Sequence, residues 1–161
     1  MWKILVSITL VSVAANASAQ QGTAASEVES AAASYAVKRF VKGHTVLDTV
    51  PLEVAGNPAH AKRTAAETAS LLRSLGLTQT ANRREVVTCA APRSTDCHLT
   101  GADGLLSFSR PFIAGDTAYV TVRMVTDGYQ KRNLYRREER LMLVRQGGVW
   151  LVKKTVGRSV T

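Results

Sequence analysis

The sequence predicts a single α+β domain in which two N-terminal helices pack on a curved, cone-like antiparallel sheet of about five to six strands. Apolar residues recur at three- and four-residue spacing in the first half of the chain, which is typical of amphipathic helices. In the second half they alternate with polar residues, which is typical of half-buried strands. Helices that precede a run of strands indicate the segregated layers of an α+β domain. The chain has 161 residues and is 45% apolar, which suits one such domain.

Residues 1–19 have the features of a signal peptide. Lys3 supplies a positive charge, residues 4–15 form an apolar segment without charge, and Ala17-Ser18-Ala19 matches a cleavage site of small residues. At ~1.5 Å per residue the apolar segment is too short to cross ~30 Å of hydrocarbon. We therefore expect cleavage near Ala19, export to the periplasm or the medium, and no transmembrane segment in the mature chain. An N-terminal anchoring helix is the alternative.

A short flexible tail at residues 20–25 is expected to precede the domain, which we place at residues 26–157. Ser26 and Glu29 match a capping box, in which each side chain satisfies a backbone amide of the other residue. The first helix is therefore predicted to begin at Ser26 and to run to about Val41.

A second helix is predicted to begin at Asn57-Pro58, with asparagine as the N-cap and proline at the first helical position. Gly76 is expected to end it. The residues at helical spacing that would form its apolar stripe are Ala61, Ala65, Ala69, Leu72 and Leu75.

Extended segments account for the remaining pattern, with a short one at 44–50 between the helices. The clearest strand has Ala118, Val120, Val122 and Met124 on one face, alternating with polar residues. The later predicted strands are 86–87 leading into Cys89, 105–109, 117–124, 133–145 and 149–156. The last two form a hairpin around residues 146–148, and their apolar residues on both faces predict that both faces of the sheet are covered there.

Part of this second half resembles a known family. Residues 114–122, 136–141, 144–145 and 147–152 are similar to the C-terminal half of nuclear-transport-factor-two-like (SnoaL-like) domains, which show a GDTA strand, a bent arginine-containing strand and an LVRxGGxWxV hairpin. The similarity covers residues 112–156, whereas the N-terminal half lacks the usual early aromatic pocket signature and carries an apparent insertion between Val86 and Leu106. The resemblance implies a cone-shaped α+β barrel, often dimeric through the outer face of the sheet. It implies no single activity, because the family includes isomerases, hydrolases and binding modules.

Two cysteines, Cys89 and Cys97, flank a turn-like segment. In an exported protein they are expected to form a disulfide that joins the neck of this loop. A metal site that also uses His98 is the alternative, but it lacks a second pair of ligands at metal-binding spacing. We therefore expect no metal, and no sequence motif indicates a cofactor.

Candidate catalytic residues are His44, Asp48 and Asp103. His44 and Asp48 lie four positions apart on one face of an extended segment, so they can form an acid/base pair. The alternative is a surface histidine and solvated aspartates. Aliphatic and aromatic residues are expected to line an apolar ligand pocket between the helices and the sheet: Tyr35, Phe40, Leu72, Val120, Val122, Met124 and Trp150.

The charge is strongly basic, with 21 Lys and Arg against 12 Asp and Glu and a formal net charge of +9, one unit less without Lys3. Arg136, Arg137 and Arg140 concentrate in one predicted strand, but Glu138 and Glu139 interrupt them. A nucleic-acid surface would also need stacking aromatic residues, so we expect a solvated ladder of Arg and Glu and no nucleic-acid partner. Weak attraction to an anionic envelope surface or to an acidic partner is expected.

These observations favour an exported, non-enzymatic domain that binds a small apolar ligand in its pocket or a protein partner on its sheet, with a homodimer through the sheet face as one arrangement. A hydrolase or isomerase that uses an Asp or His base in the pocket is the first alternative. A structural domain that interacts with the cell envelope is the second.

Overall fold

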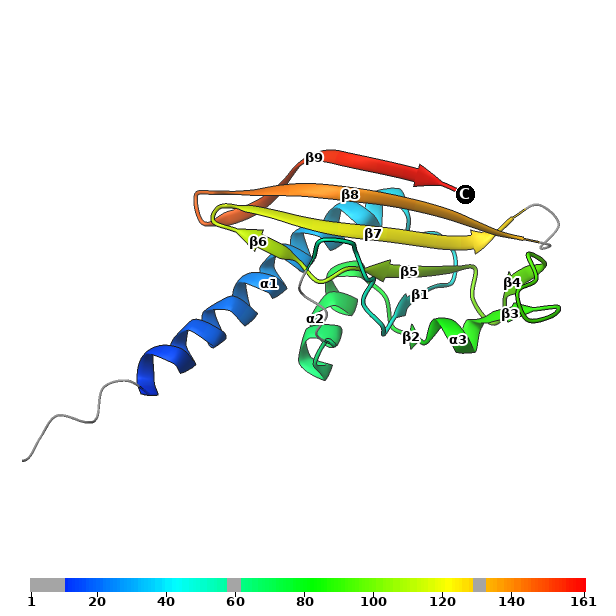
Figure 1. Cartoon of the computed structure of the whole chain (residues 1–161), viewed down its shortest axis with the longest axis horizontal. Coiled ribbons are helices and arrows are strands. Elements are labelled where there is room, and N and C mark those ends of the chain that lie inside the picture. The colour runs from blue at the N-terminus through cyan, green and yellow to red at the C-terminus, as the bar shows by residue number, and fades with distance from the viewer. Residues whose placement is uncertain (1–10, 58–61, 129–132) are drawn as a thin grey trace, which may run out of the picture.

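The computed structural model describes residues 11–57, 62–128 and 133–161, with side chains from residue 23 onward (Figure 1). Its elements in chain order are α1 (Val11–Arg39), β1 (Thr45–Asp48), α2 (Ala65–Leu75), β2 (Thr80–Ala81), α3 (Arg83–Val86), β3 (Val87–Cys89), β4 (Cys97–Leu99), β5 (Gly104–Phe108), β6 (Phe112–Ala114), β7 (Thr117–Asp127), β8 (Leu134–Gln146) and β9 (Val149–Val160). The predicted α+β class is confirmed, and α3 is a helix that the sequence pattern did not indicate.

The main sheet has the order β2-β1-β5-β7-β8-β9, and β6 pairs with β7 beyond the end of β5. Its long strands are antiparallel, but β1 pairs in parallel with both β2 and β5. The expectation of a purely antiparallel sheet is therefore wrong at this edge. The connections from β1 to β2 and to β5 are long enough to return the chain in the same direction, which a tight hairpin cannot do.

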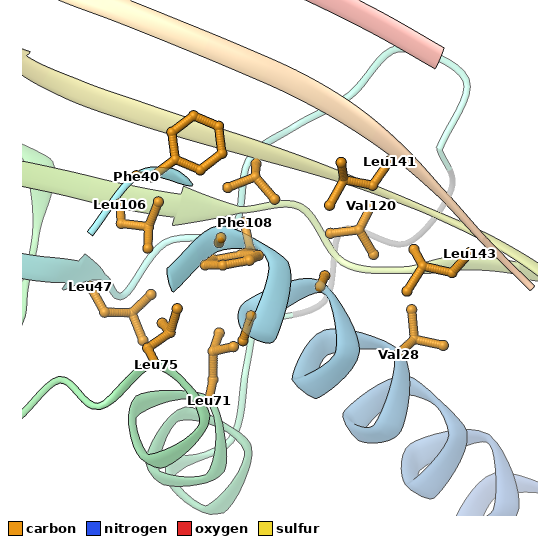
Figure 2. Packing of buried hydrophobic residues seen from close by; sticks show 14 of the residues in the cluster. Val28, Phe40, Leu47, Leu71, Leu75, Leu106, Phe108, Val120, Leu141 and Leu143 are labelled. Carbon is orange, nitrogen blue, oxygen red and sulfur yellow. The ribbon is translucent and has the colours of Figure 1, made fainter. Parts of the chain in front are cut away.

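The helices α1 and α2 cover one face of this sheet, which we call the inner face (Figure 1). Ala118, Val120, Val122 and Met124 are all buried there, so the predicted apolar row of β7 is confirmed. Figure 2 shows Val28 of α1 and Leu71 of α2 pointing toward these strands. Helix and strand residues together form one continuous hydrophobic cluster. Burial of aliphatic and aromatic side chains at about 25 cal/mol per Å² is the main stabilising contribution.

The helix α1 differs from its prediction, because it begins at Val11 and continues through residues 20–25 without a break at Ser26. The predicted capping box is wrong, since Glu29 lies inside the helix with only 2% of its surface exposed. Its carboxylate instead forms ion pairs with Arg63 and Arg110. Glu29 therefore forms ion pairs with residues distant in sequence and does not cap the helix.

The helix α2 also begins later than predicted, at Ala65 and not at Asn57-Pro58. Thr64 is its N-cap, and it forms a capping box with Glu67. The side-chain amide of Asn57 donates to the carbonyl of Arg110, and Pro58 lies outside the described residues.

The apolar stripe of α2 also differs from its prediction. Leu75 is buried and Leu72 packs against the core as predicted, but Ala65 and Ala69 are exposed and Leu71 is buried in their place. Ala61 lies outside the described residues. Gly76 ends the helix with φ 66°, as predicted.

The opposite face of the sheet, the outer face, is covered at one end by elements outside the main sheet. There α3 and the β3–β4 hairpin pack against Val46, Leu105 and Val125 in a second, smaller cluster. Cys89 and Cys97 face each other in that hairpin and form the predicted disulfide. At the other end Val149 and Leu151 of the β8–β9 hairpin remain 59% and 48% exposed, so the expectation that both faces are covered there is wrong for the single chain.

Candidate functional site

A fully buried carboxylate lies on the inner face of the sheet, near the C-terminal end of α1. Glu139 of β8 is opposite Val122 of β7, so the Glu139 side chain lies on the inner face next to the apolar row of β7. It is the charged residue among these buried side chains. Tyr35 donates to its Oε2 atom at 2.7 Å, and Arg137 and Arg39 donate to its Oε1 atom at 2.7 and 3.2 Å. With two further residues from β9, these side chains form the Glu139 cluster: Tyr35, Arg39, Arg137, Glu139, Thr155 and Arg158.

Simple periodicities bring the cluster together. Tyr35 and Arg39 are four positions apart, so they lie on the same side of α1. Arg137 and Glu139 are two positions apart on β8, so both face inward. Arg158 of β9 lies opposite Glu139 in the antiparallel register, and its Nε atom is 3.6 Å from Oε1.

The charges of the cluster do not balance. Three arginines face one glutamate, which leaves an excess of two positive charges. Burial by itself raises the pKa of Glu139, but the hydrogen bonds from Tyr35 and Arg137 and the charges of Arg39 and Arg137 outweigh it and hold that pKa below its ordinary value. Glu139 is therefore charged at neutral pH.

The arginines of the cluster are held in place but reach solvent. Arg39 lies 5.4 Å from the ring centroid of Tyr35, and Arg137 lies 5.1 Å from that of Phe40. The side chains of Arg39 and Arg137 are each 35% exposed, and that of Arg158 is 60% exposed.

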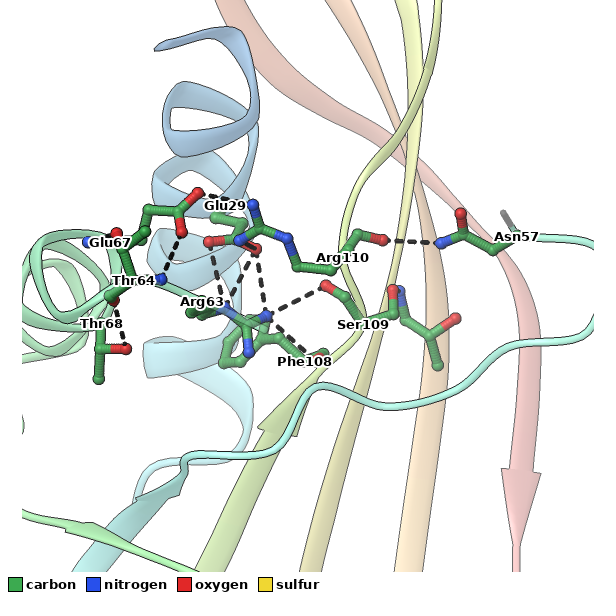
Figure 3. Close-up of polar contacts among 10 residues, drawn as sticks. Glu29, Asn57, Arg63, Thr64, Glu67, Thr68, Phe108, Ser109 and Arg110 are labelled. Atoms are coloured by element: carbon green, nitrogen blue, oxygen red, sulfur yellow. Dashed lines mark hydrogen bonds and ion pairs between the residues drawn. The ribbon is translucent and has the colours of Figure 1, made fainter. Parts of the chain in front are cut away.

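A second group of buried charges joins α1, α2 and the end of β5; we call Glu29, Arg63, Glu67 and Arg110 the Glu29 cluster (Figure 3). Arg63 donates to both oxygens of Glu29, at 3.2 and 3.3 Å, and to the carbonyls of Phe108 and Ser109. Arg110 bridges Glu29 at 3.2 Å and Glu67 at 2.6 Å.

The Glu29 cluster is closed and balanced, with two arginines facing two glutamates. The side chains of Arg63 and Glu29 are only 1% and 3% exposed. Burial raises the pKa of Glu67, but hydrogen bonds from Arg110 and Thr64 and the charge of Arg110 lower it below its ordinary value. This arrangement holds three elements together and offers no open face to a ligand.

The exposed end of the outer face carries apolar side chains. By their pairing across β6, β7, β8 and β9, one set shares this face, and we call it the outer patch: Phe112, Tyr119, Met142, Val144, Val149 and Leu151. The rings of Phe112 and Tyr119 stack with centroids 6.5 Å apart, and Arg140 lies 5.1 Å from the centroid of Tyr119. A hollow of about 50 Å³ opens beside Phe112, Tyr119 and Arg140.

The predicted catalytic residues do not come together around one cavity. His44 is exposed, and its Nε2 atom lies 2.8 Å from Oε1 of Gln79. Asp103 is exposed and accepts a hydrogen bond from the backbone amide of His44, not from its ring. Asp48 is buried on the outer face, where it accepts hydrogen bonds from the hydroxyl of Ser107 and from a backbone amide. The predicted His44–Asp48 pair is not formed.

The seven residues expected to line an apolar pocket do lie together. Five are buried members of the main core and two, Tyr35 and Leu72, are partly buried against it. Each therefore belongs to the packed core in which a ligand was expected. Small-molecule pockets usually measure ~300–1,000 Å³, whereas the hollow described above has about 50 Å³ and lies on the outer face.

The described part of the chain contains no group of three His, Cys, Asp or Glu side chains placed to hold a metal ion. Within the same residues no helix has the length and apolar character needed to cross a membrane.

The sequence did contain a signal for the Glu139 cluster that the prediction did not use. Every second residue of a strand faces the same side, and Leu143 and Leu141 face inward. The next two residues of this series toward the N-terminus are Glu139 and Arg137. Within residues 11–57, 62–128 and 133–161, the predicted solvated ladder is present only at Glu138, which pairs with Arg123 on the outer face at 2.7 Å.

Comparison with known proteins finds no match among protein families, curated proteins or solved structures. The similarity of residues 112–156 to nuclear-transport-factor-two-like domains therefore stays an expectation.

Proposed function

We propose that this protein is an exported, non-enzymatic binding module that docks a protein partner on the outer patch. The carrying observation is that Phe112, Val149 and Leu151 expose 37%, 59% and 48% of their surface on one sheet face, next to stacked aromatic rings. Aromatic, aliphatic and arginine side chains that share a surface are typical of protein interfaces.

The charge around the outer patch selects the partner. Arg140 and Lys154 share its face by register, Lys153 lies in the adjacent bulge, and the chain as a whole carries a net charge of +9. A partner with acidic side chains around an apolar centre complements this surface. A second copy of the chain would place like charges face to face, so an acidic partner is favoured over a homodimer.

The partner is expected to dock on the face of the sheet and not on its edge. The strand β9 ends the strand order, and its outer backbone edge could pair with an added strand. Two register shifts near Lys153 and Val156, together with the paired lysines, interrupt that edge. Bulges and lysines of this kind prevent edge-to-edge pairing.

Export and the lack of an enzymatic role belong to the same proposal. Residues 1–19 have the composition of a signal peptide, and the Cys89–Cys97 disulfide persists best in an oxidising compartment. His44, Asp48 and Asp103 have separate partners, so the structure does not support the hydrolase or isomerase alternative. The packed core likewise favours the protein-partner form of the hypothesis over the apolar-ligand form.

The test compares two variants that each add one acid at a half-exposed apolar position. Leu151→Glu changes the outer patch, and Val50→Glu changes a residue that is 50% exposed in the loop after β1. A candidate partner found by crosslinking the exported protein is purified, and its Kd is measured with each variant. We expect an acidic partner whose Kd rises about tenfold with Leu151→Glu, a loss typical of one interface anchor, and is unchanged with Val50→Glu.

Either of two results would overturn the proposal. One is a partner that binds both variants equally well. The other is a dimer of the protein, seen by light scattering, that dissociates with Leu151→Glu, because the outer patch would then be occupied by a second copy.

A further inference from the structure

We infer that the Glu139 cluster is a binding site for a phosphate monoester. It lies on the inner face of the sheet, so it does not depend on the function proposed for the outer patch. The geometry that carries this inference is the convergence of three arginines on one carboxylate oxygen, with their side chains partly open to solvent.

Hydrogen-bond donors remain available at this site. Each guanidinium has five N–H groups, and Glu139 accepts hydrogen bonds from one terminal nitrogen of Arg39 and one of Arg137, whereas the Nε atom of Arg158 forms only an ion pair with it at 3.6 Å. The side chains that carry the other N–H groups are 35% to 60% exposed. By contrast, Arg63 of the Glu29 cluster is 1% exposed and donates to two backbone carbonyls as well as to its carboxylate.

The arginines are also ordered before any ligand arrives. Their nitrogens lie 2.7, 3.2 and 3.6 Å from the same Oε1 atom of Glu139, so the three guanidinium groups are held close to one another. The ring contacts with Tyr35 and Phe40 further restrict Arg39 and Arg137. Binding to groups that are already ordered costs less conformational entropy than binding to free surface side chains.

The charge indicates which anion fits. Glu139 neutralises one of the three cations and leaves two positive charges, whereas a monocarboxylate would neutralise only one more. A phosphate monoester carries about −1.5 to −2 at pH 7, and its oxygens match the fork geometry of guanidinium groups. In an exported protein such a group can belong to a soluble phosphate ester or to the headgroup of an envelope lipid.

The test uses NMR titration of the whole mature protein with glycerol phosphate. Arg158→Gln is the probe variant, because Arg158 is the most exposed of the three arginines and its contact with Glu139 is the longest, so the fold is retained. Arg84→Gln on α3 is the control, since it removes the same charge from an exposed residue on the other face. We expect the backbone amides around Glu139 and Arg158 to shift and the Kd to rise about tenfold in Arg158→Gln only, as for the loss of one charged hydrogen bond.

A second arm identifies the source of the phosphate. Sedimentation with phosphatidylcholine vesicles, with and without phosphatidic acid, is compared for the same two variants. Binding to phosphatidic acid that Arg158→Gln weakens and Arg84→Gln does not would support a lipid headgroup. Titration by glycerol phosphate without vesicle binding would support a soluble ester.

The inference is overturned if neither probe distinguishes Arg158→Gln from Arg84→Gln. It is also overturned if the amide shifts lie at Arg140 on the outer face instead of at Glu139. Arg137→Gln gives an independent check, since it removes the donor at 2.7 Å and should weaken binding at least as much as Arg158→Gln.

Discussion

The Glu29 cluster and the Glu139 cluster use the same chemistry for different ends. In each, a buried glutamate meets several arginines across an interface with α1. Arg63 is 1% exposed and serves the fold alone, whereas Arg158 is 60% exposed and keeps donors open to solvent. Residue type alone therefore does not distinguish the structural clamp from the proposed binding site, and the exposure of the arginines differs between them.

Charge balance separates the two clusters as clearly as exposure does. The Glu29 cluster has as many arginines as glutamates, and the carbonyls of Phe108 and Ser109 accept hydrogen bonds from one terminal nitrogen of Arg63, while its other terminal nitrogen is buried without a hydrogen-bond partner. The Glu139 cluster keeps an excess of two positive charges. Removing one partner of a closed, buried pair leaves an unpaired charge in the interior, which is much more costly than the same change near solvent.

The largest effect is expected from breaking the closed cluster. Glu29→Ala leaves Arg63 and part of Arg110 without a carboxylate in a buried site, so the free energy of unfolding should fall by about 3–5 kcal/mol. Urea unfolding measures it, and Glu27→Ala, an exposed neighbour on α1, is the control. Equal stability of the two variants would show that the Glu29 cluster is not the clamp described here.

A smaller loss is expected at a restraint remote from both clusters. Cys89→Ser removes the disulfide of the β3–β4 hairpin, and for a loop this short the chain-entropy model assigns ~2–3 kcal/mol. The melting temperature of the oxidised protein should fall, and wild-type protein under a reducing agent should melt with the variant. An unchanged melting temperature would mean that the disulfide contributes little to stability. The effect of Glu29→Ala would then have to be compared with a different stabilising interaction.

The acid side of the stability profile tests the open cluster. The folded-state pKa of Glu139 lies below its ordinary value of 4.5, so its contribution is fully present above pH 4.5 and is lost as the pH falls through the folded pKa. Glu139→Gln should therefore lower stability at neutral pH, with a difference from wild type that shrinks below pH 4.5. Thermal unfolding at a series of pH values measures this. A difference that stays constant down to acid pH would contradict the predicted role of the charged carboxylate.

The smallest effect is expected at the exposed arginine. Arg158→Gln should change the free energy of unfolding by less than about 1 kcal/mol, because a largely exposed ion pair contributes little. The same variant should lose phosphate affinity. A large loss of stability would instead mean that Arg158 stabilises the fold as the arginines of the Glu29 cluster do. The two clusters would then not differ in function as described.

Much of the second half of the fold could be read from local pattern. The inward row from Ala118 to Met124, the hairpin turn at Gly147 and the pairing of Cys89 with Cys97 all follow from alternation and spacing between near neighbours. The starts of the two long helices could not be read in the same way. Ser26 and Asn57 both carry good capping signals, but α1 runs from Val11 through Ser26, and Thr64 caps α2.

The candidate sites show the same division. Alternation alone could have put Arg137 and Glu139 on the inner face, but nothing local shows that Tyr35 and Arg39 of α1 meet them there, more than ninety positions away. The outer patch likewise depends on which end of the sheet the β3–β4 hairpin covers.

The amino-acid sequence by itself determined the α+β class, the strongly basic charge, the disulfide and the buried face of the central strand, because each depends on composition or on residues close together in the chain. Only the tertiary structure decided that the residues expected to line a pocket belong to the packed core, that one buried glutamate pairs with closed-off arginines, and that the other lies among arginines open to water. Burial and charge balance are properties of the whole packed chain, so residues far apart in sequence settle them together.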